Sequence, residues 1–179
     1  MSEDKKSKKL LILSPLTGKV MPLEDVPDPV FSQKIIGDGV AVFPSEGRIV
    51  SPVDGQVVSV ADTGHAYGLK TEDGLEILIH VGLETVSLKG ECFNVYVKPG
   101  DQVKAGDKLA EVDLGFLAEK NISPVTPVLI CGGMEGKKLI KDGGEMAQAG
   151  KSVLLTVEEE ADAEESFSKD GEGIAAKAE

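Results

Sequence analysis

The sequence has few aromatic residues and few cysteines. Aromatic side chains make up 4% of its 179 residues, and tryptophan is absent, so we expect an aliphatic core. The two cysteines, Cys92 and Cys131, have no Cys-x-x-Cys spacing and are too few for a disulfide framework. The sequence therefore excludes a small disulfide scaffold, and we expect buried, reduced thiols.

Long apolar runs and an excess of basic residues are also missing. A bilayer-spanning helix needs about 18 or more consecutive apolar residues, and the run Leu10–Leu13 is too short even for the core of a signal peptide. The formal net charge is −12, whereas nucleic-acid binding usually requires a basic surface. We therefore expect a cytoplasmic protein that binds no nucleic acid.

Glycine and proline, by contrast, are frequent, with 21 and 9 residues. Set among many Val, Ile and Leu, they predict short strands joined by tight turns. The phrase Ser-Pro-x-x-Gly occurs at Ser14 and Ser51, and a weaker form occurs at Ser123, as in folds built from similar hairpins. The sequence predicts an all-β fold: a compact antiparallel β-sandwich of the barrel-sandwich type, with a duplicated hairpin. One or two short helices are expected, over residues 114–121 and 134–141.

Charged segments flank one domain. Residues 1–9 are polar and rich in lysine, and residues 158–179 are strongly acidic. Such segments bury too little apolar surface to order themselves. We expect a flexible basic arm over residues 1–9, a single domain over residues 10–157 and a disordered acidic tail over residues 158–179.

The two histidines of the chain, His65 and His80, flank the turn sequence Glu72-Asp73-Gly74. Residues 66–71 and 75–81 are predicted to form the arms of a hairpin. A turn with two central residues would place both rings on one face, whereas an odd-length loop or a bulge would put them on opposite faces.

Alternation along the second arm indicates whether the histidines point toward the core or toward the outside of the sheet. Ile77, Ile79 and Val81 form its apolar side and belong to the core, so His80 points outward. On this interpretation the histidines are ringed by three side chains, Tyr67, Leu69 and Leu78.

Two neighbouring imidazoles are compatible with several chemistries. A neutral ring nitrogen can attack a phosphoryl group, while a second ring N–H holds the oxygens of that group. The pair could instead supply two ligands to Zn²⁺, which would need a third. From these residues alone, a phosphoryl site, half a metal site and two ordinary strand residues all stay open.

The residues that flank the pair extend into a longer pattern. It contains Thr63-Gly64-His65-Ala66-Tyr67 and the stretch 76–91, and it continues over residues 24–31 and 34–39 and at Thr126-Pro127-Val128. This pattern resembles the glucose-type enzyme IIA of the bacterial phosphoenolpyruvate-dependent sugar phosphotransferase system, over roughly residues 10 to 157.

The resemblance implies a phosphocarrier, a phosphotransferase component that acts in a relay. It would accept a phosphoryl group from the small carrier HPr on His80 and pass it to a IIB domain, which phosphorylates a sugar as the IIC membrane domain imports it. By position, His65 would stabilise the phosphoryl group and Thr63 would orient the supporting ring. No cofactor is required, and the chain would meet the membrane through its partners only.

The resemblance also places partner-binding residues around the histidines. Asp28 and Glu84 match acidic positions that would meet the basic face of HPr. The apolar members of this rim are Val30, Phe31, Ile35, Ile36 and Leu78. Without the resemblance, the phenylalanine and the two isoleucines would be placed in the core.

Other functions fit parts of the sequence. A zinc metallopeptidase of the lysostaphin type needs a His-x-His pair, and a biotinyl or lipoyl carrier needs a motif such as Met-Lys-Met; the sequence contains neither. A regulatory role in binding metabolic enzymes or permeases is compatible with the same face. So is a zinc ion shared between His65, His80 and a partner's carboxylate. The sugar stays open among glucose, N-acetylglucosamine and β-glucosides.

Overall fold

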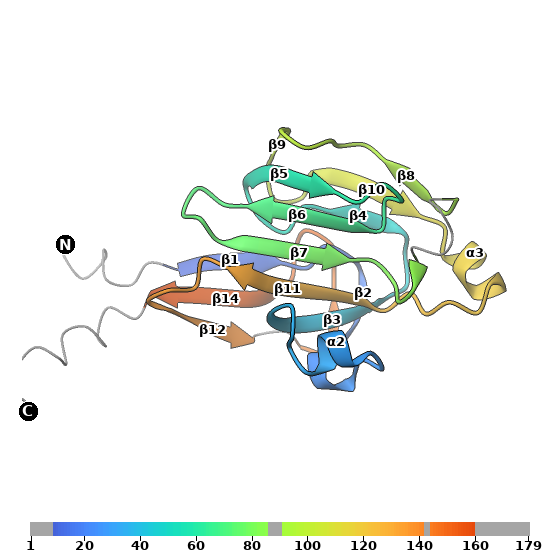
Figure 1. The fold of residues 1–179 in the computed structure, drawn as a ribbon, viewed down its shortest axis with the longest axis horizontal. Helices are drawn as coiled ribbons and strands as arrows, with labels where there is room; N and C mark the ends of the chain where they lie inside the picture. The colour runs from blue at the N-terminus through green and yellow to red at the C-terminus, as the bar shows by residue number, and fades with distance from the viewer. Residues whose placement is uncertain (1–8, 86–90, 142–143, 160–179) are drawn as a thin grey trace, which may run out of the picture.

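The computed structural model describes residues 9–85, 91–141 and 144–159. Strands dominate it and the helices are short (Figure 1), so the prediction of an all-β sandwich is confirmed. Most of the predicted arm and tail, and residues 86–90 of the family-like pattern, lie outside the described residues. Lys9, Glu158 and Glu159 lie in strands, so strand structure extends past both predicted domain bounds.

Antiparallel pairing joins the strands into three sheets, whose buried faces share one aliphatic core. The 8-stranded sheet has the order β13 (Met146–Ala147), β2 (Gly18–Pro22), β3 (Asp38–Pro44), β11 (Thr126–Gly132), β7 (Glu76–His80), β6 (Ala66–Lys70), β5 (Gly55–Val60) and β9 (Gln102–Val103). One 3-stranded sheet contains β1 (Lys9–Leu13), β14 (Val153–Glu159) and β12 (Lys137–Lys141). The other contains β4 (Arg48–Val50), β10 (Lys108–Val112) and β8 (Phe93–Val95).

The repeated Ser-Pro phrase forms two equivalent turns. Ser14 and Ser51 are fully buried, and each hydroxyl donates to the backbone carbonyl two residues further on, at 2.6 and 2.7 Å. Reciprocal backbone hydrogen bonds join the turns, from the end of β1 to Pro52 and from the end of β4 to Pro15. This reciprocal pairing is the structural form of the duplication predicted from the sequence.

One of the two expected helices is present. Helix α3 (Leu114–Glu119) begins at the Asp113 cap and stops before Asn121, whose φ of 58° lies outside the helical region. The helix expected over residues 134–141 is wrong: Gly136 turns the chain with a φ of 72°, and β12 follows and pairs with β14. A glycine turn and cross-strand pairing therefore outweigh the helical pattern. No helix among the described residues has the length and apolar character needed to cross a membrane.

Two short helical segments were not expected, η1 (Leu23–Asp25) and α2 (Pro29–Ser32). Asp28 caps α2, because its carboxylate accepts a hydrogen bond from the Val30 N–H at 3.1 Å. For α2, the sequence did contain a helix-start signal, a capping aspartate followed by proline at the first helical position.

The cysteines differ in burial. Cys92 is buried in the main core, as expected, whereas Cys131 is exposed. Because Ile130 faces the core from β11, alternation turns the next side chain outward. The expectation of a buried thiol at Cys131 is therefore wrong.

The β6–β7 hairpin has an odd-length turn. Thr71 and Leu75 pair across it, with the Thr71 N–H donating to the Leu75 carbonyl at 2.9 Å, so the three residues between them form the loop. Gly74 completes it with a φ of 92°, as glycine does in three-residue hairpin loops. The two-residue turn assumed from the sequence is therefore wrong, and Ala66 rather than His65 lies opposite His80.

This register determines which face each side chain occupies. Ile77 and Ile79 face the core as predicted. Tyr67 lies opposite Ile79 and Leu69 opposite Ile77, and both are 0% exposed. The expectation that Tyr67 and Leu69 ring the histidines is therefore wrong, because they belong to the core side.

Candidate functional site

The two imidazole rings meet on the outer side of the large sheet. His80 is the last residue of β7, and His65 directly precedes β6. Their ring centroids are 5.0 Å apart and their planes cross at 74°, an edge-to-face contact. Both side chains are half-buried. The prediction that the rings meet is confirmed, although the register that produces the contact differs from the predicted one.

A turn before β6 brings His65 to the same side as His80. The His65 carbonyl accepts from the Val81 N–H at 2.7 Å, so His65 is the cross-strand neighbour of a buried core residue. Regular strand alternation would send the His65 side chain toward that core. Instead the chain turns at Gly64, which has a φ of 76° and whose N–H donates to the Ala61 carbonyl at 2.8 Å. The His65 ring thereby lies against His80.

The Gly82 carbonyl sets the tautomer of His80. It lies 2.9 Å from Nδ1 of His80, and because a carbonyl only accepts, Nδ1 carries the proton. The unshared electron pair is then on Nε2. Sequence reasoning did not single out Gly82; the signal was a glycine two residues after a functional histidine. This glycine has a φ of 80°, and a Cβ at this position would lie 2.4 Å from the Thr85 methyl group.

Thr63 holds the second ring. Its hydroxyl oxygen lies 2.5 Å from Nδ1 of His65. When the hydroxyl donates, Nδ1 is the acceptor and the His65 proton is on Nε2. The pair then presents one nucleophilic nitrogen, on His80, beside one N–H donor, on His65.

Burial keeps both rings neutral near pH 7. For His65, burial and the neighbouring His80 lower the pKa below its ordinary value of 6.5. For His80, burial is the largest influence and lowers the pKa, while hydrogen bonds to backbone carbonyls and the charge of Asp28 partly oppose it. A neutral imidazole keeps the electron pair that a nucleophile needs.

Phe31 forms the floor of the site. Its ring centroid is 5.0 Å from that of His80 with the planes at 56°, and the side chain is only 4% exposed. It belongs to a second apolar cluster, separate from the main core. The buried members of this cluster are Leu23, Val26, Phe31, Ala41, Leu83, Val125 and Leu129, with Met21 and Leu78 packed against it.

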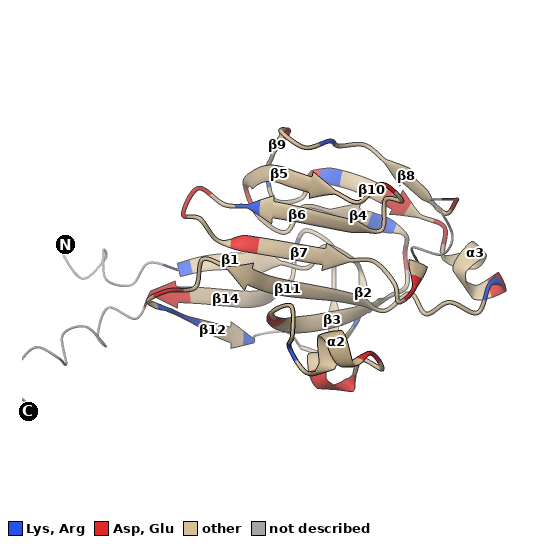
Figure 2. Cartoon of the chain, in the orientation of Figure 1, with Lys and Arg blue, Asp and Glu red and all other residues tan. Residues whose placement is uncertain are grey.

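The remaining predicted rim residues are more accessible. Val30, Ile35 and Ile36 are 38%, 66% and 40% exposed, which is high for large apolar side chains. Asp28 is half-buried, and Glu84 is exposed at a φ of 65°. Figure 2 shows acidic residues near α2, the short helix that carries Val30. Lys34 lies among them and pairs with Glu24 at 3.0 Å. Through Phe31, which contacts His80, the histidines adjoin a surface of exposed apolar side chains with charged residues of both signs at its border.

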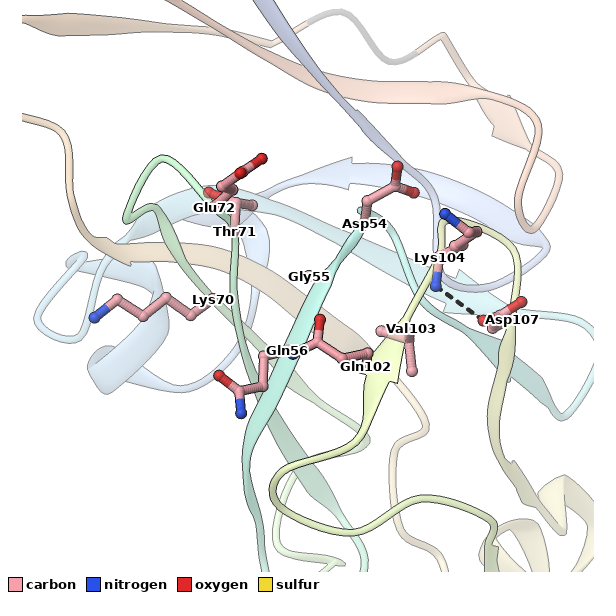
Figure 3. Close-up of a pocket in the computed structure, with 10 residues that line it drawn as sticks. All are labelled: Asp54, Gly55, Gln56, Lys70, Thr71, Glu72, Gln102, Val103, Lys104 and Asp107. Atoms are coloured by element: carbon pink, nitrogen blue, oxygen red, sulfur yellow. Dashed lines mark hydrogen bonds between the residues drawn. The ribbon is translucent and has the colours of Figure 1, made fainter.

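A separate hollow of about 630 Å³ lies at the other end of β6 from the histidines. Its lining mixes acidic, basic and amide side chains, and Figure 3 shows Lys70 extending away from Lys104 and Asp107. These groups do not converge on one point. Within the described ranges, no group of three or more His, Cys, Asp or Glu side chains is arranged to hold a metal ion.

Comparison with known proteins identifies the family of this chain. The family model for the phosphoenolpyruvate-dependent sugar phosphotransferase system, EIIA 1, matches residues 10–135. A PTS system glucose-specific EIIA component from Oceanobacillus iheyensis is 49% identical over 128 residues, or 72% of this chain and 78% of that protein. The component of the same name from Halalkalibacterium halodurans is 46% identical over 147 residues, or 82% of this chain and 85% of that protein.

A solved structure shares the fold. The glucose permease IIA from Mycoplasma capricolum superimposes with a TM-score of 0.78 at 39% sequence identity, covering 83% of this chain and 96% of that chain. The match spans the sandwich that carries the histidines, and the metallopeptidase alternative is not favoured. The chain belongs to the EIIA 1 family of the phosphoenolpyruvate-dependent sugar phosphotransferase system, and it is a phosphocarrier of that system.

Proposed function

We propose that this chain accepts a phosphoryl group from phosphorylated HPr on Nε2 of His80 and passes it to a IIB domain. The observation that carries the proposal is the hydrogen bond between Nδ1 of His80 and the Gly82 carbonyl. It leaves the electron pair of the ring on Nε2, so the same ring is both oriented and nucleophilic.

The transfer balances without an added acid or base. The Nε2 electron pair of His80 forms the new P–N bond as the bond between phosphorus and HPr breaks, and the electrons of that bond leave with HPr. Such a reaction needs in-line placement and charge stabilisation more than covalent machinery. Transfer to IIB is the same step with His80 as the leaving group.

His65 is proposed to stabilise the phosphoryl group, with Thr63 as the residue that orients its ring. The Thr63 hydroxyl next to Nδ1 supports this role, because it favours a proton on Nε2 of His65. That N–H can donate to a phosphoryl oxygen beside His80, since the ring centroids are 5.0 Å apart. Donation to a charged oxygen in a half-buried site is stronger than to a neutral one.

The surrounding surface is proposed to bind the partners. Val30, Ile35 and Ile36 are exposed apolar side chains that would pack against HPr or IIB and exclude water from the phosphorylated ring. Asp28 and Glu84 would meet basic groups of HPr, which mainly affects encounter rate and orientation. We place this exchange in the cytoplasm, with the membrane reached through the permease alone.

The proposed sugar is glucose, because the similar EIIA proteins carry glucose-specific names. Sugar selection itself resides in the IIB and IIC partners, so the histidine site needs no sugar pocket. A purified glucose-type IIB domain is therefore the appropriate acceptor for transfer assays.

The test is incubation with phosphoenolpyruvate, enzyme I and HPr, followed by intact mass measurement and acid treatment. We expect one acid-labile phosphoryl group on the wild-type chain and none on His80→Ala. The His65→Ala variant controls for the loss of a neighbouring ring, because it leaves the acceptor nitrogen of His80 in place. A wild-type chain without label, or a labelled His80→Ala variant, would refute the assignment.

A further inference from the structure

The chain has two tyrosines, and one of them places its hydroxyl group inside the core. The Tyr67 side chain is 0% exposed and lies opposite Ile79 in the β6–β7 pair. Its hydroxyl donates to the carbonyl oxygen of Gly64 at 2.5 Å. Burial of a hydroxyl is costly unless it is hydrogen-bonded, so this bond explains how an otherwise aliphatic core holds the group.

The Gly64 carbonyl that accepts this hydrogen bond is part of the peptide group between Gly64 and His65. The orientation of this peptide affects the backbone angles of His65 and hence the direction of its ring. As the cross-strand neighbour of Val81, His65 would face the core if β6 simply continued. The Gly64–His65 peptide is therefore the point at which the ring is turned toward His80.

The turn is held on several sides. The Gly64 N–H donates to the Ala61 carbonyl at 2.8 Å. A Cβ at Gly64 would lie 2.9 Å from a methyl carbon of Val95 and 3.1 Å from Cβ of Phe93, so the turn is packed closely against β8. The Tyr67 hydroxyl adds a hydrogen bond to the carbonyl of this same residue, from the core side.

We propose that Tyr67 is a positioning residue for phosphoryl transfer: its hydroxyl holds the Gly64–His65 peptide in the orientation that directs His65 toward His80. The proposal rests on the proposed function, because it acts through His65. Phenylalanine would fill the same space in the core but would leave the Gly64 carbonyl without this donor. The functional contribution of Tyr67 thus resides in one oxygen atom.

Burial supports this role by raising the pKa of Tyr67 far above its ordinary value of 10.0. The phenol therefore keeps its proton and stays a donor throughout the pH range in which the histidines change charge. The hydrogen bond to Gly64 does not switch as the phosphoryl group arrives or leaves.

The first test compares Tyr67→Phe with Tyr96→Phe. Tyr96 is 53% exposed and its hydroxyl donates to Glu111 at 3.2 Å, so the control removes a hydrogen-bonded tyrosine oxygen from the surface. Rapid-quench transfer from the phosphorylated chain to IIB should be slowed about ten- to a hundredfold at saturating IIB in Tyr67→Phe. The KM for IIB should stay unchanged, because the exposed docking residues are intact. Tyr96→Phe should match the wild type.

The second test reads the ring positions directly. In ¹⁵N-histidine-labelled, unphosphorylated protein, Tyr67→Phe should lose the nuclear Overhauser contacts between the His65 and His80 rings and shift the His65 nitrogen signals. Replacement of Tyr67 with 4-aminophenylalanine, which keeps an N–H donor at the same place, should restore contacts and rate. Replacement with 4-fluorophenylalanine, which fills the volume without donating, should not.

The outcomes separate the two proposals. If the wild-type chain takes no label in the same assay, the proposed function fails. If the wild type is labelled but Tyr67→Phe transfers at the same rate, or keeps the ring contacts, the role of Tyr67 is refuted. Equal behaviour of the two para-substituted variants would refute it as well, and that comparison does not depend on the folding of Tyr67→Phe.

Discussion

The rings of His65 and His80 contact each other edge to face at a centroid distance of 5.0 Å, although the residue opposite His80 in the sheet is Ala66. Strand pairing alone would not produce this contact, because neighbouring positions on a strand face opposite sides. The site therefore depends on the turn that precedes β6 as much as on the sheet that carries it.

Replacement of His65 tests the division of roles in the pair. We expect His65→Gln to accept a phosphoryl group on His80 but to pass it to IIB about a hundredfold more slowly or worse. The flexible amide replaces the ring that the Thr63 hydroxyl orients, so its N–H is no longer held in a fixed direction toward the phosphoryl oxygens. The measurement is loss of label from the preloaded variant on addition of IIB. Wild-type transfer would contradict the role assigned to His65.

Replacement of Thr63 tests the hydrogen bond to Nδ1 of His65. Thr63→Val keeps the shape but removes the hydroxyl that lies 2.5 Å from the ring nitrogen. We expect the transfer rate to fall about tenfold, since the supporting ring loses its preferred tautomer. The matched control is Thr63→Ser, which retains a hydroxyl and should keep most of the rate. Equal rates for the two variants would argue against an orienting role.

Stability should fall in weak acid because of the histidine pair. Burial lowers the pKa of both rings below 6.5 in the folded chain, so the unfolded chain binds protons first as the pH drops. The stabilising contribution is complete above 6.5 and is lost as the pH falls through the folded pKa values. Urea unfolding at about pH 7.5 and 5.5 measures the difference. The double variant His65→Gln, His80→Gln should lose less free energy of unfolding than the wild type; an equal loss would locate the effect elsewhere.

Substitutions at Phe31 and Ile35 should separate floor from rim. Phe31 is 4% exposed, so Phe31→Ala should cost about 3 to 5 kcal/mol of unfolding free energy. Ile35 is 66% exposed, so Ile35→Ala should change stability by about 0.5 kcal/mol or less but weaken HPr binding. Denaturant unfolding and transfer kinetics measure the two effects. A large loss of stability in Ile35→Ala would mean that this side chain is not a surface residue.

The duplicated turns predict similar losses in the two halves of the sandwich. Ser14 and Ser51 are both fully buried and donate to equivalent carbonyls. Ser14→Ala and Ser51→Ala should therefore each cost about 1 to 2 kcal/mol, because each leaves a buried carbonyl without its donor. A more than twofold difference between the two would show that the halves are not energetically equivalent.

Sequence reasoning succeeded where the pattern was local and regular. Alternation along Ile77, Leu78 and Ile79 correctly separated core from outer face. It failed on the hairpin turn, because Glu72-Asp73-Gly74 is compatible with both a two-residue and a three-residue loop. The Thr71–Leu75 pair that decides between them is a local backbone pairing that the residue types alone do not specify. The contact between the rings was predicted correctly from the wrong register.

The burial of the side chain beneath the histidines was harder to predict. Phe31 lies in α2, a helix of 4 residues, which is too short to show periodicity. Its burial depends on the second apolar cluster, whose members are far apart in sequence, from Leu23 to Leu129. The hydrogen bond from the buried Tyr67 hydroxyl to Gly64 was missed for another reason: the assumed two-residue turn placed Tyr67 on the outer face.

The antiparallel pairing of β1 with β14 has a practical consequence. Lys9 lies opposite Glu158, so the start of the first strand and the end of the last strand meet at one edge of the sandwich. β7 runs away from that edge and ends at His80 (Figure 1). A fluorophore, affinity tag or fused protein attached through either terminus would join the framework at the end remote from the imidazoles. A circular permutant closed across this edge, and opened in a loop outside β6 and β7, would keep the strands that carry both rings uncut.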